Sequence, residues 1–346
     1  EKRPVSVEIM ENMVSTIENI IQNSLDREIT SSRIGDLVME QLPELASENL
    51  LLEPYSRNTA PCIAYATYRL LKKDPEAKVV VTPSDHLIED EALFIQTIEK
   101  AFDYIEGNDV LMTLGVVPTR PDTNYGYIQA CGGSDVYKND RPMQVKTFTE
   151  KPDRDLAKVF ISTGEFFWNA GIFLWKAETI RKKMEKYLPE VAGLFKGWES
   201  ALGTSVENEF IAKAYTGCRN ISIDYGVMEK TDEAWMYPVK FGWSDVGTWG
   251  TMTDVMSDNV KGNAMLDDTC EKDAYGNAVS AEKTLIENTS GVLVVSPEKK
   301  KLIAIKGLED YMVVDTEDVL VICPKDDKKF KDFITGLGMP DYEKYR

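Results

Sequence analysis

Apolar runs typical of β-strands alternate with amphipathic helical stretches over the middle of the chain. Residues 78–82 (KVVVT) and 110–117 (VLMTLGVV) predict two buried strands, and residues 94–105 between them repeat apolar positions at helical spacing. Residues 177–216 indicate further helices with short breaks. The strand–helix–strand order is typical of a doubly wound α/β fold, which we expect over residues 45–257.

The first 44 residues follow a different pattern, in which apolar positions recur at helical spacing on both sides of a turn. Residues 7–21 predict one helix. A second helix, capped by Ser31 or Ser32, would carry the apolar residues Ile34, Leu37, Val38 and Leu42. Because two helices alone bury little surface, we expect residues 1–44 to form a helical hairpin docked on another part of the protein.

From about residue 258 the chain consists of short β-rich runs with Gly, Asn and Asp between several of them. Five runs predict strands, at residues 277–281, 292–296, 302–305, 311–315 and 319–323. A short helix is expected near residues 328–335. Residues 258–346 are therefore predicted to form a small β-rich domain.

Composition and charge restrict the classes of function. The 40 Lys and Arg residues against 58 Asp and Glu residues give a formal net charge of −18. Nucleic-acid binding is not expected because it needs clustered cations, whereas a small anionic substrate can still bind a local basic group or a bound metal ion. The single histidine, His86, excludes mechanisms that need a pair of histidines.

The cysteines and the apolar runs bear on location. The five cysteines are scattered without a CxxC motif, so a zinc site is not expected. Reduced thiols of this kind are typical of a cytoplasmic protein. The chain contains no run of about 18 apolar residues and no recognisable signal peptide, so we expect no membrane span.

Two aspartates that follow predicted strands are candidate metal ligands. Asp85 lies in PSDH directly after the first strand, and Asp245 lies in WSDVGTW after a strand predicted at residues 235–240. Ligands of α/β proteins bind beyond the carboxyl ends of parallel strands, and carboxylates suit a hard cation such as Mg²⁺. The alternative for each aspartate is a capping or turn residue at a helix start.

Arg57, Asn58 and Thr59 stand in a loop before a helix predicted at residues 62–73. A guanidinium suits an oxyanion or a ribose, and the amide and hydroxyl groups suit the edge of a base. The alternative is a polar loop that caps the helix.

Five further residues are candidates for recognising a sugar phosphate. They are Gly126 in TNYGYI, Glu150 and Lys151 in EKP, Asn169 in WNAGIF and Asp224 in SIDYG. Glycine lets the backbone approach a ligand, amide and carboxylate groups suit hydroxyls, and a lysine suits a phosphate. The alternatives are a hairpin turn, a solvated ion pair between neighbours, and packing or helix capping.

The joint order of these motifs resembles that of the mannose-1-phosphate guanylyltransferases (GDP-mannose pyrophosphorylases). RNTAP, PSDH, PTRP, YGYI, EKP, WNAGIF, SIDY and WSDVGTW occur in the family's order over about residues 41–346. The resemblance implies a Rossmann-like nucleotide-diphospho-sugar transferase domain and a small C-terminal unit like a left-handed β-helix. It also implies a cytoplasmic enzyme, for which a homodimer is one assembly to consider, that converts GTP and mannose 1-phosphate to GDP-mannose and pyrophosphate with Mg²⁺.

The resemblance assigns a role to each candidate residue. The residues that would hold Mg²⁺ are Asp85 and Asp245, and Lys151 would meet the sugar phosphate. The guanosine would contact Arg57, Asn58 and Thr59. The mannose would contact Gly126, Glu150, Asn169 and Asp224.

The chain departs from the family at its start. The family's first strand and its Gly-rich signature of the type GGxGTRxWPxSR, which cradles the triphosphate, do not occur in these 346 residues. Residues 2–5 and 29–39 instead resemble part of an ATP-cone, as in the ribonucleotide reductase transcriptional repressors, and an unrelated amphipathic hairpin is the alternative. We expect neither ATP binding nor DNA binding from this fragment.

The missing signature sets two expectations. Turnover should be very slow or absent, because the loss of one contact to a transition-state phosphate costs orders of magnitude in rate. The missing strand should also leave a sheet edge exposed. The alternatives to an active guanylyltransferase are an inactive protein that binds sugar phosphate or GDP-mannose, an interaction protein, and a pyrophosphorylase for another hexose 1-phosphate.

Overall fold

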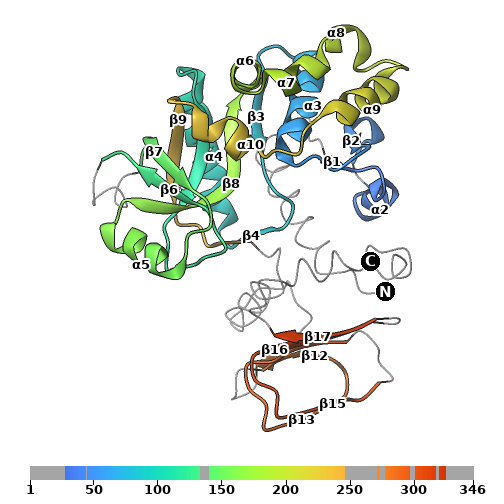
Figure 1. The fold of residues 1–346 in the computed structure, drawn as a ribbon, viewed down its shortest axis with the longest axis vertical. Helices are drawn as coiled ribbons and strands as arrows, with labels where there is room; N and C mark the ends of the chain where they lie inside the picture. The colour runs from blue at the N-terminus through green and yellow to red at the C-terminus, as the bar shows by residue number, and fades with distance from the viewer. Residues whose placement is uncertain are drawn as a thin grey trace. The chain divides into compact units, whose positions relative to one another are not determined.

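The computed structural model describes residues 28–43, 45–132, 140–245, 271–272, 277–296, 301–316 and 319–324 (Figure 1). The chain divides into two compact units. Within these ranges the larger unit comprises residues 28–84 and 88–243, and the smaller unit comprises residues 85–87 and those from 244 onward. The helices expected at residues 7–21 and 328–335 lie outside the described residues, and the three-part division expected from the sequence stays a prediction.

The larger unit is built on a six-stranded mixed sheet in the order β3-β8-β5-β9-β7-β6. The strands are β3 (Lys78–Val81), β5 (Leu111–Val116), β6 (Tyr127–Ala130), β7 (Met143–Thr149), β8 (Phe166–Lys176) and β9 (Ala234–Val239). β5 runs parallel to β9, and β8 is antiparallel to both β3 and β5. Every residue of β5 is buried, as the sequence predicts.

Strand β8 closes part of this sheet into a ring. Its first residues pair with β6 as well as with β5, and β6 pairs with β7, which pairs in turn with β9. Strands β6 to β9 contribute to one buried apolar cluster, made of Ile128, Ala130, Met143, Phe167 and Met236. Because β5 and β9 are also paired, each strand of the ring is held on both edges.

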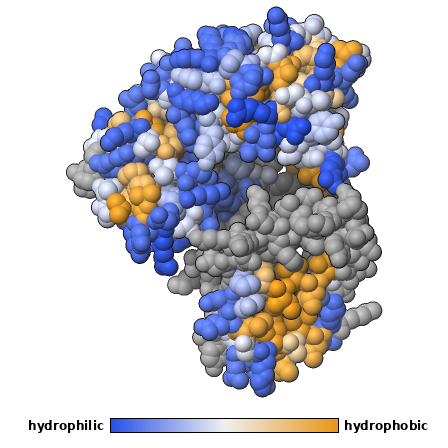
Figure 2. Space-filling view, in the orientation of Figure 1, coloured by the Kyte–Doolittle hydropathy of each residue, from blue (hydrophilic) through white to orange (hydrophobic). Residues whose placement is uncertain are grey.

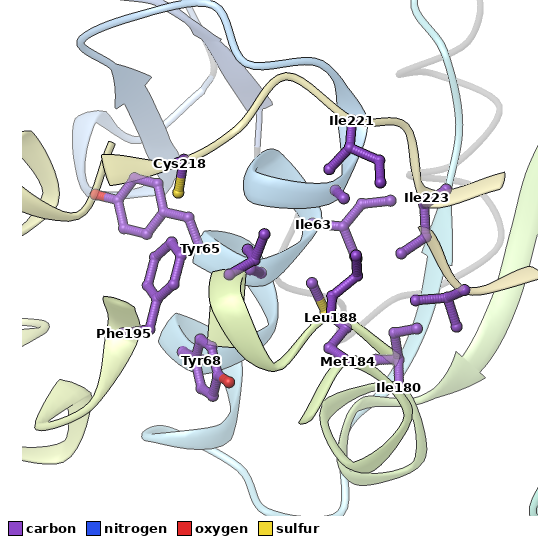
Figure 3. Packing of buried hydrophobic residues seen from close by; sticks show 14 of the residues in the cluster. Ile63, Tyr65, Tyr68, Ile180, Met184, Leu188, Phe195, Cys218, Ile221 and Ile223 are labelled. Carbon is purple, nitrogen blue, oxygen red and sulfur yellow. The ribbon is translucent and has the colours of Figure 1, made fainter. Parts of the chain in front are cut away.

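Helices cover both faces of the sheet (Figure 1). The first face is covered by α4 (Glu91–Glu106) and α5 (Arg154–Thr163), and the second by α3 (Thr59–Leu71) and α6 (Ala177–Tyr187). Beyond α3, the same apolar cluster continues into α7 (Pro189–Ala192), α8 (Trp198–Ala201) and α9 (Glu207–Gly217). Successive residues of β8 point to opposite faces, so Leu174 and Trp175 enter different cores. Figure 3 shows the core under α3, where the rings of Tyr68 and Phe195 stack with centroids 5.4 Å apart. The expected helices of this unit are therefore confirmed.

Strand β3 differs from the sequence prediction. It lies at the edge of the sheet, and its three valines are only partly buried. In the described ranges β3 pairs with β8 alone, whereas β5 is covered on both edges. The expected burial of β3 is therefore wrong, because this strand has one neighbour where a buried strand has two.

The start of the described chain forms a strand, a helix and a strand. β1 (Glu28–Ser31) pairs in parallel with β2 (Leu50–Glu53), and α2 (Gly35–Gln41) lies between them. The expected second helix is confirmed, but its expected cap is wrong, because the helix begins after Ile34 without a side-chain cap. The β-branched residues of β1 favour the extended backbone that makes this pairing possible.

The smaller unit contains strands that stack in parallel, as a β-helix-like unit requires. One layer contains β11 (Glu271–Lys272), β12 (Ala278–Ser280), β14 (Leu293–Val295), β16 (Tyr311–Asp315) and β17 (Leu320–Pro324), and the other contains β13 (Thr284–Glu287) and β15 (Ile303–Lys306). The β12–β14, β14–β16 and β13–β15 pairs are parallel. The five expected strands are present, whereas β13 was missed because Thr284 and Glu287 leave only two apolar residues in this run.

Hydrophobic residues gather on the visible face of the smaller unit, whereas most of the visible surface of the larger unit is hydrophilic (Figure 2). The exposed large apolar side chains of the smaller unit are Leu285, Leu302, Leu320 and Ile322. No helix within the described ranges has the length and the apolar character that crossing a membrane requires.

Replacing Phe167 by alanine should destabilise the ring severely. Its side chain is fully buried among residues of three other strands, so a cavity is expected to lower the free energy of unfolding by about 3–5 kcal/mol. Urea denaturation measures this loss. The control is Val159→Ala on the exposed face of α5, which should change stability by less than about 0.5 kcal/mol. Equal effects of the two substitutions would contradict the ring core.

Candidate active site

Four of the residues predicted to recognise a sugar lie together in the larger unit. We call Gly126, Glu150, Asn169 and Asp224 the Gly126 cluster. The backbone N–H of Asn169 donates to the carbonyl of Gly126 at 2.8 Å, and its side-chain Nδ2 donates to Oδ1 of Asp224 at 2.9 Å. A Cβ placed on Gly126 would lie 2.8 Å from Oε2 of Glu150 and 3.6 Å from Cβ of Asn169. The backbone of Gly126 therefore touches the side chains on both sides of it.

The strand registers explain this convergence. Tyr127 of β6 pairs with Thr149 of β7 on one edge and with Trp168 of β8 on the other, and both pairings are antiparallel. Continuing each register by one residue places Gly126 between Glu150 and Asn169. The connection from β5 to β6 therefore does not make a hairpin, which was the alternative interpretation of the YGYI motif, since these two strands are not paired.

Asn169 is held so that its amino group points at Asp224. Its Oδ1 accepts hydrogen bonds from the hydroxyl of Thr113 at 3.3 Å and from the backbone N–H of Gly171 at 3.2 Å. Thr113 is fully buried in β5 and was missed by the sequence reasoning. Its signal was a single hydroxyl residue inside an otherwise apolar strand, which a buried hydrogen-bonding role explains.

Negative charge concentrates around Asp224. Burial raises the pKa of the Asp224 carboxyl, the hydrogen bond from Asn169 lowers it, and the charge of Glu150 raises it further. Glu229 in η4 (Met228–Lys230) takes part as well, because burial and the charges of Asp224 and Glu150 raise its pKa. Glu229 was also missed, although it follows Asp224 by five positions in SIDYGVME. Carboxylates and an amide arranged in this way can accept from and donate to neutral hydroxyl groups.

Lys151 places a cation beside the Gly126 cluster. Its Nζ lies 3.4 Å from Oε1 of Glu150, and its side chain is 62% exposed. An ion pair this exposed contributes about 0–1 kcal/mol to stability, so an incoming anion can displace it at low cost. Lys151 also has a left-handed backbone with φ of 42°, which turns the chain sharply after Glu150.

Arg57, Asn58 and Thr59 already carry structural hydrogen bonds. Asn58 caps α3 by accepting from the backbone N–H of Thr59 at 2.8 Å, as the capping alternative predicts. The hydroxyl of Thr59 accepts from the backbone N–H of Ile223 at 2.9 Å, and Nε of Arg57 donates to the carbonyl of Tyr215 at 3.3 Å. The amino group of Asn58 and the hydroxyl hydrogen of Thr59 are donors that these bonds do not use. The loop is thereby tied to α10 (Ile223–Gly226), which holds Asp224.

Asp85 and Asp245 both interact electrostatically with His86. β4 (His86–Ile88) and β10 (Trp243–Asp245) form a two-stranded sheet. Oδ1 of Asp85 lies 4.0 Å from Nε2 of His86. Burial lowers the pKa of His86 to about 4, and the charge of Asp245 opposes that shift, so the imidazole is neutral at pH 7. Asp85 does not cap α4, which is capped by Asp90, and Asp245 is the last residue of β10.

The donor set fits a hard cation bound in part by substrate. Two carboxylates beside a neutral imidazole offer oxygen ligands, and Mg²⁺ is commonly held by one or two carboxylates together with waters and phosphates. In the part of the chain that the structure describes, no group of three or more His, Cys, Asp or Glu side chains is placed to hold a metal ion.

A surface pocket of about 380 Å³ lies at the other end of the central sheet. Its lining residues are Asp109, Thr179, Lys182, Lys183 and Glu233. Asp109 and Glu233 come just before β5 and β9 begin. Asn169 of the Gly126 cluster instead pairs with Gly115, near the end of β5. This pocket contains none of the predicted site residues.

The family model described as "Nucleotidyl transferase" matches residues 1–262. The chain belongs to this family of nucleotidyltransferases. The match begins at the first residue and gives no support to the resemblance of residues 1–44 to an ATP-cone.

Within the family, the chain is similar to mannose-1-phosphate guanylyltransferases. It is 34% identical over 305 residues to the Salmonella montevideo enzyme of that name, which covers 85% of this chain and 60% of that protein. The enzyme of Escherichia coli strain K12 is 32% identical over 321 residues, or 90% of this chain and 63% of its own length. The alginate biosynthesis protein AlgA of Pseudomonas aeruginosa is 34% identical over 296 residues, which make up 84% of this chain and 57% of that protein. The chain thus spans about 60% of the length of these relatives.

Solved structures show the same fold. A mannose-1-phosphate geranyltransferase from Thermus thermophilus aligns with a TM-score of 0.77 and 25% identity, over 95% of this chain and 89% of that one. A mannose-6-phosphate isomerase from Helicobacter pylori aligns with a TM-score of 0.57 and 27% identity, over 68% of this chain and 91% of that one. The Rossmann-like α/β class expected from the sequence is therefore confirmed.

Replacing Asp224 by asparagine should stabilise the protein more as the pH rises. The raised pKa means that the folded state binds more protons than the unfolded state above the ordinary value of 3.8. Stability of the wild type therefore falls as the pH rises from that value to the raised pKa, and asparagine removes this dependence. The loss amounts to about 1.4 kcal/mol for each pH unit that separates the folded from the unfolded pKa. Urea denaturation between pH 4 and 8 measures the difference.

The matched control is Asp155→Asn on α5. Lys158 lowers the pKa of the Asp155 carboxyl, so the stability difference between this variant and the wild type should change with pH in the opposite sense. A difference for Asp224→Asn that is flat or falls with pH would contradict the electrostatics described for the Gly126 cluster.

Proposed function

We propose that the chain is a mannose-1-phosphate guanylyltransferase, which forms GDP-mannose and pyrophosphate from GTP and mannose 1-phosphate. The observation that carries this proposal is the convergence of Gly126, Glu150, Asn169 and Asp224 with Lys151 beside them. The names of the relatives support the choice of sugar and nucleotide. A cytoplasmic location and a homodimer stay predictions.

The chemistry requires alignment more than proton transfer. A phosphate oxygen of mannose 1-phosphate attacks the α-phosphorus of GTP, the new P–O bond forms, and the bond to the leaving pyrophosphate breaks. The attacking oxygen is already ionised at pH 7, so no protein base is needed, in line with the absence of a histidine pair. The protein must orient the two phosphates and neutralise their charge.

The Gly126 cluster would orient the sugar. The amino group of Asn169 donates, the carboxylates of Glu150 and Asp224 accept, and Gly126 leaves room for the ring to approach the backbone. Lys151 would leave its weak ion pair with Glu150 to meet the sugar phosphate. The carboxylates suit the neutral hydroxyls, while the lysine suits the anionic end of the same molecule.

Arg57, Asn58 and Thr59 would contact the guanosine with the donors that their structural bonds do not use. Asp85 and Asp245 would hold Mg²⁺. When bound, the ion would neutralise the charge that develops on the phosphates. Substituting either aspartate by asparagine should abolish the part of the GDP-mannose-forming activity that Mg²⁺ stimulates.

GDP-mannose formation is the direct test of the function. The 346-residue chain incubated with GTP, mannose 1-phosphate and Mg²⁺ should form GDP-mannose and pyrophosphate, detected by mass and by phosphate release. Because these residues lack the Gly-rich signature, we expect a rate at least about 100-fold below that of a full-length relative assayed in parallel.

The outcomes of this assay separate the two parts of the prediction. A rate equal to that of the relative would show that the signature is dispensable here. Formation of a different nucleotide sugar from a panel of hexose 1-phosphates would replace the proposed substrate. No product, together with no binding of GDP-mannose by calorimetry, would overturn the proposed function.

Substituting Gly126 by alanine should weaken sugar binding without weakening the fold. The added methyl group meets the end of the flexible Glu150 side chain, which can move aside, so the unfolding midpoint should stay within error. The displaced carboxylate and the filled space should raise the Kd for GDP-mannose by at least about tenfold, or about 1.4 kcal/mol. Calorimetry measures the Kd.

The matched control is Gly107→Ala at the end of α4, where an added Cβ has no atom within 4 Å. This variant should bind GDP-mannose as the wild type does. Unchanged binding by Gly126→Ala, or an equal loss in both variants, would count against a sugar site at the Gly126 cluster.

A further inference from the structure

Arg120 lies over two aromatic rings behind the Gly126 cluster. Its guanidinium carbon is 5.4 Å from the centroid of the Trp168 ring and 6.0 Å from that of Tyr125. The two rings meet edge to face at 5.1 Å, and Tyr125 also contacts Trp243 at 5.0 Å. Trp168 and Tyr125 are almost completely buried, so the guanidinium covers the outer side of a packed aromatic group.

Asp122 fixes the guanidinium in this position. Its Oδ2 accepts from Nε of Arg120 at 3.0 Å and from the terminal amino group at 2.8 Å. The side chain of Asp122 is only 8% exposed, and its Oδ1 accepts from the backbone N–H of Asn124 at 2.9 Å. Its carbonyl accepts from the hydroxyl of Tyr127 at 2.9 Å. Hydrogen bonds and an ion pair within residues 120–127 therefore hold this segment in one conformation.

The two rings under Arg120 belong to the residues directly before two members of the cluster. Tyr125 precedes Gly126, and Trp168 precedes Asn169. Successive side chains of a strand point to opposite faces, so Trp168 and Asn169 lie on opposite sides of β8. Arg120 thus acts on the far side of β8 from the Asn169 side chain, and its role is to hold positions rather than to touch the sugar.

We propose that the Arg120–Asp122 pair is a positioning clamp that fixes Gly126 against Asn169 and so sets the affinity for the sugar. The clamp joins the loop before β6 to β8 through one cation and two rings, in addition to the backbone bond from Asn169 to Gly126. It would keep Gly126 at the spacing that leaves room for a ligand. The part of this proposal that concerns affinity rests on the function proposed above.

The clamp is tested with Arg120→Ala and Arg120→Lys in the 346-residue chain. Hydrogen exchange of the free protein measures how firmly the clamp holds the loop, without any ligand. In Arg120→Ala the backbone amides of residues 124–130 should exchange about tenfold faster than in the wild type, because the loop loses its side-chain link to β8 and keeps only the backbone bonds. Arg120→Lys keeps the cation over the rings but loses the forked contact with Asp122, so it should give an intermediate rate.

Calorimetry reads the consequence for the ligand. Arg120→Ala should raise the Kd for GDP-mannose about five- to tenfold and leave the Kd for GTP unchanged, and Arg120→Lys should recover part of the loss. The control is Lys158→Ala, which removes an exposed ion pair with Asp155 on α5 and should change neither readout.

Each outcome decides the proposal. Exchange at residues 124–130 that matches the wild type would overturn the clamp, and so would an equal rise in both Kd values, which indicates general loosening. If the wild type does not bind GDP-mannose, the proposed function fails while the exchange result still decides whether the clamp exists. Faster exchange with unchanged affinity would overturn its role in setting the affinity.

Discussion

The double pairing of Tyr127 is the constraint on which the rest of the larger unit depends. A strand of four residues, β6, is hydrogen-bonded on one edge to β7 and on the other to β8, and this closes five strands into a ring. In such a ring a slip of one residue at any pair would turn side chains to the wrong face and would break the closure. The ring therefore fixes Gly126, Glu150 and Asn169 relative to one another more firmly than a loop would.

The carboxyl groups in and beside the Gly126 cluster give it its chemical character. Burial and the charge of Glu150 raise the pKa of Asp224, and partial burial and the charges of Asp224 and Glu150 raise that of Glu229, because both effects disfavour the charged forms. A neutral polyhydroxyl ligand relieves part of this cost, since its hydroxyls donate hydrogen bonds to the carboxylates. The same surroundings repel a phosphate, so the cation of Lys151 at their margin sets the direction in which a sugar phosphate would enter.

The sequence indicated which candidate residues come together better than it indicated their surroundings. Gly126, Glu150, Asn169 and Asp224 were each ambiguous alone, and their shared order with a family selected them. Thr113 and Glu229 were missed because buried hydrogen bonds and mutual repulsion depend on which strands and helices become neighbours. Strand β3 was assigned correctly, but its burial was not, since burial depends on how many strands flank it. The pairing of β1 with β2 was missed for the same reason, because a strand of four residues, of which only Ile29 and Thr30 are β-branched, does not determine which strand it pairs with.

The hydrogen bond from Ile223 to Thr59 joins the two halves of the proposed substrate site. Thr59 belongs to the loop assigned to the guanosine, and Ile223 stands immediately before Asp224 on a helix of only four residues. Because the helix is so short, this bond ties the position of Asp224 closely to that of the loop. Any coupling between the two halves would be reciprocal, because thermodynamic linkage requires each ligand to change the affinity of the other by the same factor. A single hydroxyl thus joins the loop that precedes α3 to the backbone directly beside Asp224.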